Sequence, residues 1–275
     1  MRPTRTLPPS APAATDPSRR RALAALPPLL ALAAWRPARA AEGLSAAARS
    51  AMVAFDGLYI PALFLTGSAG KSDDGPARAA GAMQRLAQAW PARREALARV
   101  APSARPWREA LAAVERHLAR AGAEVGERRW EASHATLEHV REALFDARRA
   151  LGLAYPLDDF TAFHGAMEAL ANRTAAPDAQ RPAIERDYAA ARALWRRVER
   201  LDLDATALGL SPARQALLRQ GLADEGAALG RLSQALAARV PEADLLKACA
   251  AIKGPFVKAY TAFGWPAGET PALPA

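Results

Sequence analysis

The chain has 275 residues, of which 51% are hydrophobic and 24% are charged, a composition that excludes a disordered protein and fits one or two globular domains. Residues 1–40 hold seven Arg and one Asp and so carry +6 of the net charge of +9, which leaves no clustered basic surface for nucleic acid. The single cysteine, Cys249, excludes an internal disulfide and covalent haem of the Cys-x-x-Cys-His kind.

The N-terminal segment has the three parts of an export signal. An arginine cluster at Arg19, Arg20 and Arg21 precedes an apolar run over 22–35, and small residues at Ala38 and Ala40 form a cleavage site. We therefore predict a signal at 1–40 and a periplasmic or secreted mature protein. No transmembrane anchor is expected after cleavage, because no later stretch approaches the ~20 consecutive apolar residues of a spanning helix.

The signal also suggests an export route. The segment SRRRAL, residues 18–23, resembles the twin-arginine signal family, whose pattern is Ser-Arg-Arg-any-Phe-Leu-Lys. The arginine pair and the leucine match, whereas Ala22 and Ala24 stand in place of Phe and Lys. The resemblance implies that the protein crosses the membrane already folded. The two departures leave the Sec route open.

After residue 40, apolar residues recur with the helical period, and no run alternates for long enough to indicate a strand. The sequence predicts an all-α fold, a single antiparallel bundle of about seven to eight helices at 41–275. The expected helices lie at 44–65, 76–100, 104–121, 126–151, 157–172, 181–203, 211–239 and 242–263. Paired long helices at 76–121 and 181–239, each with an early tryptophan, hint at an internal duplication with a boundary near 155.

Two neighbouring helices carry the side chains with the most chemistry. These candidate metal ligands, each beside an apolar stripe, are His134, Glu138, His164, Met167 and Glu168. Each His-to-Glu step of four residues places both side chains on one helix face. Imidazoles and carboxylates suit zinc, iron or copper, and a His–Met pair suits copper or b-type haem.

Helix geometry favours a structural interpretation of these residues. In an antiparallel hairpin that turns near 152–156, a rise of ~1.5 Å per residue puts His134 ~27 Å from the turn and His164 ~11 Å from it. The two histidines should then not share an ion. Glu168 comes level with Arg141, so we expect an Arg141–Glu168 ion pair that sets helix register, in preference to a metal site.

The C-terminal segment combines aromatic and basic side chains. Phe256, Tyr260 and Phe263 form a helical stripe, and Lys253 and Lys258 flank it. The stripe fits a final helix docked on the core. The alternative is an aromatic and basic rim around a pocket, in which lysine would orient an anion.

The sequence favours an exported, non-catalytic binding or accessory protein whose partner is an unknown protein or small molecule. The alternative is a metal- or b-haem-binding redox bundle that uses the His, Glu and Met side chains of the helices at 126–151 and 157–172. A nucleophile, a base and an orienting group cannot be placed from spacing in a helical chain without an elbow motif, so nothing argues for an enzyme.

The export route can be tested in the signal. Replacing both arginines of the pair, Arg19→Lys with Arg20→Lys, should abolish export if the twin-arginine route is used, because that route requires the pair. Fractionation of periplasm and cytoplasm measures the outcome. Undiminished export would instead indicate the Sec route.

Overall fold

The computed structural model describes residues 44–173 and 180–264, which contain nine α-helices and one short 3-10 turn and no strand. The all-α prediction is confirmed. The expected export signal, with Arg19, Arg20, Arg21, Ala38 and Ala40, lies outside the described residues.

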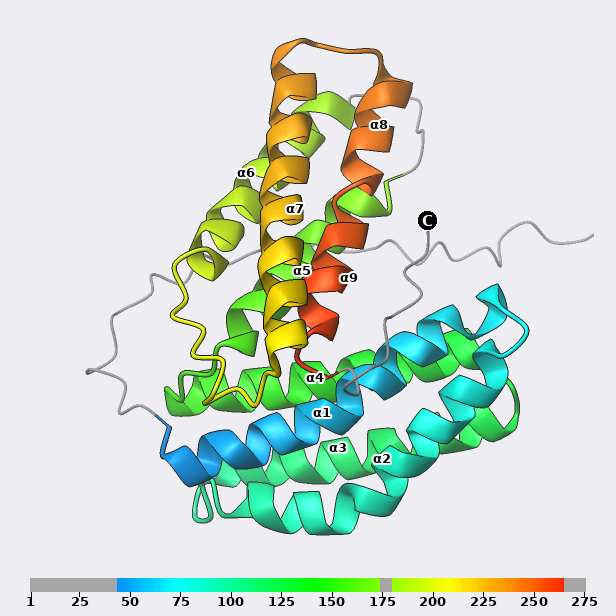
Figure 1. Ribbon diagram of the computed structural model, residues 1–275, viewed down its shortest axis with the longest axis vertical. Helices are drawn as coiled ribbons and strands as arrows, with labels where there is room; N and C mark the ends of the chain where they lie inside the picture. The colour runs from blue at the N-terminus through cyan, green and yellow to red at the C-terminus, as the bar shows by residue number, and fades with distance from the viewer. Residues whose placement is uncertain (1–43, 174–179, 265–275) are drawn as a thin grey trace, which may run out of the picture. The chain divides into compact units, whose positions relative to one another are not determined.

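The first four helices form one packed set, seen at the bottom of Figure 1. They are α1 (Ala46–Ser68), α2 (Gly75–Ala98), α3 (Arg105–Gly126) and α4 (Trp130–Leu151), with the 3-10 turn η2 (Ala69–Lys71) after α1. Each helix packs against the next, and α4 returns to α1. The set is therefore a closed four-helix ring.

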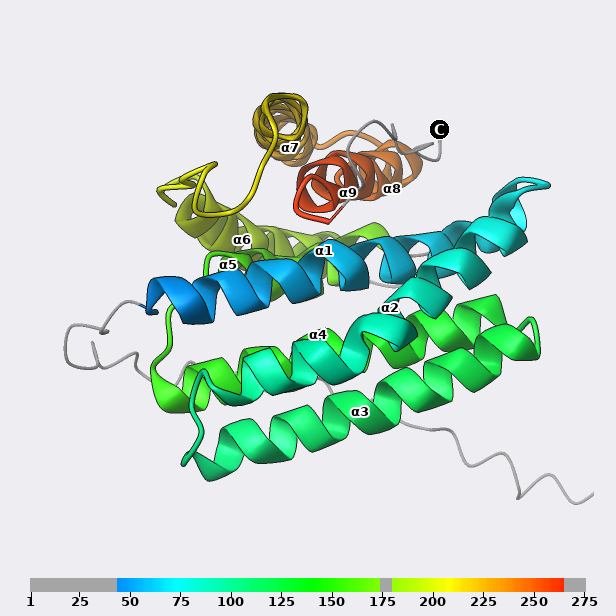
Figure 2. The same ribbon diagram turned by 60° about the horizontal axis from the view of Figure 1, so that its bottom comes forward.

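The remaining helices form a second set whose axes cross those of the first in Figures 1 and 2. They are α5 (Leu157–Ala171), α6 (Gln180–Val198), α7 (Pro212–Ala237), α8 (Glu242–Ala250) and α9 (Lys253–Thr261). Helices α8 and α9 follow one another along α7 and close the ring on α5. The two sets touch where α5 meets α4 and where α9 meets α1.

The prediction of one helix over 242–263 is wrong, because the chain breaks between α8 and α9. Pro255 has no N–H group to donate to the carbonyl of Ala251, and a proline ring clashes with that carbonyl in a continuous helix. Residues 251 and 252 form a turn there. The break leaves α9 as a separate short helix, which packs on α7 and also contacts α1.

The two sets share an aromatic arrangement. Phe55 of α1 meets Trp90 of α2 edge-on, with ring centroids 5.8 Å apart. Phe160 of α5 meets Trp195 of α6 edge-on at 6.4 Å, and the two pairs have the same separation along the chain. The internal duplication with a boundary near residue 155 stays a prediction, and this repeated order agrees with it.

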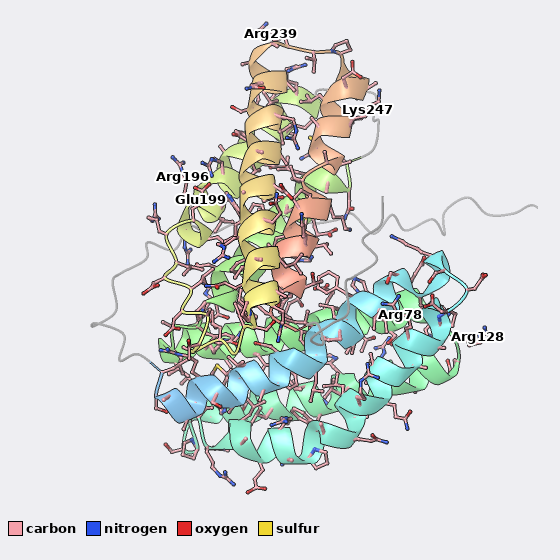
Figure 3. The ribbon with its side chains drawn as sticks, viewed as in Figure 1. Arg78, Arg128, Arg196, Glu199, Arg239 and Lys247 are labelled. Atoms are coloured by element: carbon pink, nitrogen blue, oxygen red, sulfur yellow. The ribbon has the colours of Figure 1, made fainter. Side chains whose placement is uncertain are left out.

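The turn after α3 and the turn after α7 share an unusual backbone conformation. Arg128, after α3, has φ of 59°, and Arg239, after α7, has φ of 51°. Both lie in the left-handed region, which non-glycine residues rarely adopt. Figure 3 shows each of these arginines at the end of its set.

Helix α1 differs from the sequence-based expectation about membrane segments. With its 3-10 extension, Ala46–Lys71 is long and apolar enough to span a membrane by length and composition, with a mean hydropathy of 1.4. The expectation that no stretch after the signal approaches such a segment is therefore wrong. Half of that window is buried inside the fold, where α1 packs against α2, α4 and α9.

A close helix crossing fixes α9 on α7. A Cβ atom added to Gly221 of α7 would lie 2.5 Å from the backbone nitrogen of Ala259 in α9. Gly230, on the same helix, is exposed and has no atom within 4 Å of such a Cβ. Of these two glycines, therefore, packing requires only Gly221.

This crossing gives a matched test of the fold. Gly221→Ala should lower the free energy of unfolding by about 1–3 kcal/mol, because the backbones of α7 and α9 must separate. Gly230→Ala should raise it by about 0.5–1 kcal/mol, because alanine favours a helix interior. Denaturant unfolding of both variants measures the difference. Equal effects would show that α9 does not pack on Gly221.

Candidate functional site

The candidate residues of α4 and α5 converge where the two sets meet. Nη2 of Arg141, in α4, lies 2.7 Å from Nδ1 of His164, in α5. Nζ of Lys253, at the start of α9, lies 2.8 Å from Oε1 of Glu168 in α5. Three helices thus contribute charged or polar groups to one place, which we call the junction.

The predicted Arg141–Glu168 ion pair is not the pairing in the described structure. Arg141 is paired with Glu138 on its own helix, and Glu168 is paired with Lys253. The prediction assumed that α4 and α5 run side by side, whereas they cross and each packs along other helices. Distances from the connecting turn therefore do not decide which side chains meet.

His134 is held by a carbonyl group of α1. Its Nδ1 lies 2.8 Å from the carbonyl oxygen of Leu63, which can only accept, so Nδ1 carries the proton. Gly67 makes this approach possible, because a Cβ there would lie 2.9 Å from the same ring nitrogen. Nε2 of His134 then faces Oε1 of Glu138 at 3.7 Å. Burial lowers the pKa of His134.

His164 has the opposite tautomer. Its Nδ1 accepts from Arg141, because a guanidinium group only donates, so its proton is on Nε2, 3.6 Å from Oε1 of Glu168. Burial lowers the pKa of His164 to about 2, and the charges of Arg141, Lys253 and His134 lower it further. His164 is therefore neutral in the physiological range.

The five candidate metal ligands do not form one centre in the described residues. No group of three or more His, Cys, Asp or Glu side chains lies close enough there to hold a metal ion. Met167 is fully buried in the core. Two cations, Arg141 and Lys253, stand against the carboxylates that would bind a metal.

Arg141 is the deepest charged group of the junction. Its side chain is 5% exposed, and Nη2 serves Glu138 and His164. Its Nε and Nη1 atoms are buried and make no hydrogen bond of standard geometry in the described structure, although a hydrogen bond with Arg141 partly offsets the burial that raises the pKa of Tyr260. The guanidinium carbon lies 5.8 Å from the centre of the Tyr260 ring. Arg141 therefore carries unused donors inside the protein.

A small cavity adjoins Arg141. Its polar lining comes from α1, α4, α5, α9 and the α4–α5 connection, and comprises Asp56, Tyr59, Arg141, Arg148, Tyr155, Thr161 and Tyr260. The hydroxyl of Tyr59 donates to the carbonyl of Leu137 at 2.8 Å, which fixes α1 on α4. Burial raises the pKa of Tyr260 to about 12, so this phenol stays protonated.

The far side of the cavity contains an acid that lacks a cation of its own. Tyr155 donates its hydroxyl to Oδ2 of Asp56 at 2.6 Å. Arg148 lies nearby, but its hydrogen bonds go to Asp158, at 2.5 to 3.0 Å. Burial of the carboxyl group raises the pKa of Asp56 to about 6, although the hydrogen bond from Tyr155 and the charge of Arg148 oppose this shift.

The C-terminal stripe was predicted either to dock on the core or to form a pocket rim. Phe256, Tyr260 and Phe263 are all buried, and their rings pack on Phe163 or Phe160 of α5, as a docked helix requires. Tyr260 also lines the cavity. The two lysines separate, because Lys253 joins the junction and Lys258 pairs with Asp224 of α7 at 2.8 Å.

Sequence reasoning missed the acid and phenol of the cavity. Asp56 lies in an apolar helix, and Tyr155 lies in a turn, with 99 residues between them. No spacing rule connects such distant positions. The local signal is that Asp56 is the one acidic residue of the mainly apolar α1.

A pair of double-mutant cycles tests the observed pairing. The cycle of Arg141→Met with Glu138→Gln should return a coupling of about 0.5–3 kcal/mol, because these side chains form a partly buried ion pair. The cycle of Arg141→Met with Glu168→Gln should return a smaller value. Urea unfolding measures both. A larger coupling for Arg141 with Glu168 would restore the hairpin pairing.

Comparisons of the chain with protein-family models, curated proteins and solved structures give no match.

Proposed function

We propose that this chain is an exported periplasmic binding protein that holds a small ligand at the junction and catalyses no reaction. The proposal joins two independent features: an N-terminal segment with the order of an export signal, and a polar cavity between two helix sets. Cavities between helices are common ligand sites in helical proteins.

The proposal is supported most strongly by Arg141, whose guanidinium group is buried with two nitrogen atoms that lack an acceptor. Leaving buried donors without acceptors costs about 1–3 kcal/mol for each group, so native proteins rarely keep them. Arg141 has two nitrogen atoms in this state, beside a cavity. A ligand with hydrogen-bond acceptors would satisfy them and would be held in a defined orientation.

The surrounding groups suit binding better than catalysis. His134 is fixed by Leu63 and His164 by Arg141, and in the described residues neither histidine has a hydroxyl or thiol group as its hydrogen-bond partner. A general base must lie within hydrogen-bond reach of the group that it deprotonates. The histidines therefore serve as fixed supports in this proposal.

The alternative function is a metal- or b-haem-binding redox protein. The unprotonated Nε2 of His134, 3.7 Å from Oε1 of Glu138, is the one arrangement that favours it, because a hydrogen bond at Nδ1 commonly orients a metal-binding histidine. Metal analysis and a visible spectrum of periplasmic protein distinguish the two functions. Stoichiometric metal or a haem Soret band would support the alternative.

The binding function is tested on protein purified from the periplasm and examined by native mass spectrometry. Wild-type protein should carry a bound small molecule that Arg141→Met loses. Arg105→Met is the matched control, because Arg105 is an exposed arginine whose partner is Glu109 in the same helix.

The thermal midpoint should follow the ligand, because a ligand that binds only the folded state raises it. Stripping the ligand from wild type should lower the midpoint toward that of Arg141→Met. A wild-type protein without bound small molecule, and without a shift when periplasmic small molecules are added, would contradict the proposal.

A further inference from the structure

We propose that the ligand of the junction is a small anion that binds Arg141, and that Asp56 takes up a proton when the anion enters. This inference rests on the proposed function, because it names the ligand class of the same site. It follows from the donors of Arg141, from the charge inventory around the cavity and from the position of Asp56.

The N–H groups of Arg141 require a ligand that accepts hydrogen bonds. Guanidinium groups have only N–H donors, and Nε and Nη1 of Arg141 have no partner in the described structure. An anion forms shorter and stronger hydrogen bonds to such a group than a neutral acceptor does. The cavity has room for about one water-sized group, which restricts the ligand to the smallest anions.

The charged side chains around the cavity indicate that the anion must enter together with a proton. Three ion pairs surround the junction in the described residues: Arg141–Glu138, Arg148–Asp158 and Lys253–Glu168. Both histidines have lowered pKa values and are counted as neutral. Asp56 is then a fourth carboxylate beside three cations. An anion added while Asp56 is ionised would place two uncompensated negative charges at one cavity.

Asp56 can remove that conflict by protonation. Its carboxyl group faces Tyr155 of the α4–α5 connection, Arg148 of α4 and Asp158 of α5. Tyr59 and Tyr260, from α1 and α9, also line the cavity and stay protonated, because burial raises their pKa values. The pKa of Asp56, raised to about 6 by burial, makes proton uptake near neutral pH inexpensive.

The uptake leaves the total charge of the cavity unchanged. One negative charge disappears from Asp56, and one arrives with the anion at Arg141. A protonated Asp56 keeps the hydrogen bond from Tyr155 on one oxygen and carries the proton on the other. The net process is the uptake of a small acid as its anion and its proton, held by two different groups.

Isothermal titration of the full mature chain with sodium formate tests the inference. Formate presents one carboxylate on three heavy atoms, and formamide is its neutral control. At pH 7.5, titrations in buffers of different ionisation enthalpy should show the uptake of nearly one proton for each formate bound. Between pH 7 and 8, affinity should fall about tenfold, because Asp56 must be reprotonated above its pKa.

Two variants assign the groups. Asp56→Asn keeps an acceptor for Tyr155 but cannot titrate, so formate should bind with the same affinity from pH 6 to 8 and without proton uptake. Arg141→Met should lose at least tenfold in formate affinity, whereas the surface control Arg105→Met should match wild type. If Arg141→Met fails to fold, the Asp56→Asn titrations still decide the question.

Each outcome separates this inference from the function on which it rests. Formate binding without proton uptake, or a pH dependence that survives in Asp56→Asn, would overturn the role of Asp56. Wild-type protein that ignores formate, nitrate and chloride, yet carries another small molecule that Arg141→Met loses, would overturn the anion while the binding function stands. Absence of any ligand, native or added, would overturn both.

Discussion

The buried guanidinium of Arg141 is the group on which the junction depends, because it is charged, almost fully enclosed and incompletely hydrogen-bonded. Burying a charge is tolerated only when partners compensate it. Glu138 supplies the opposite charge, and His164 supplies an acceptor across the crossing of the two helix sets. These contacts fix α4 against α5, yet they use only one of the three guanidinium nitrogens.

Most of the fold could be predicted from the sequence, because helix periodicity is a local property. The apolar stripe of α3 from Trp107 to Ala121 is buried as expected, and Pro212 begins α7 after the capping side chain of Ser211. The break before α9 was missed although Pro255 is visible in the sequence. An apolar stripe that continues past a proline hides the break, because the residues on both sides of it are buried.

The candidate site could be predicted only in part. The sequence identified His134, Glu138, Arg141, His164 and Glu168, all of which lie at the junction. The two His–Glu pairs lie side by side on their helices as the spacing predicted. The Arg141–Glu168 pairing was wrong, because the crossing of α4 and α5 depends on how the two sets pack and not on the turn that connects them. Asp56 and Tyr155 were missed because only the tertiary structure brings them together.

A second buried acid shows why the setting of Asp56 matters. Glu225 of α7 is fully buried, and burial raises its pKa to about 8, so it is protonated at neutral pH. The cavity beside Arg141 does not include it. Glu225, a neutral acid packed in the core, affects stability alone. Asp56, in contrast, lines the same cavity as Arg141, whose guanidinium group has donors without acceptors.

The two helix rings have a consequence for how the halves hold together. Each ring closes on itself, yet one apolar core runs through both, and Phe64 of α1 packs on Tyr260 of α9 with ring centroids 5.9 Å apart. The polar cavity lies within this shared core, where α1, α4, α5 and α9 meet. A guest there would touch both rings at once, so its binding would make the rings melt more nearly as one unit.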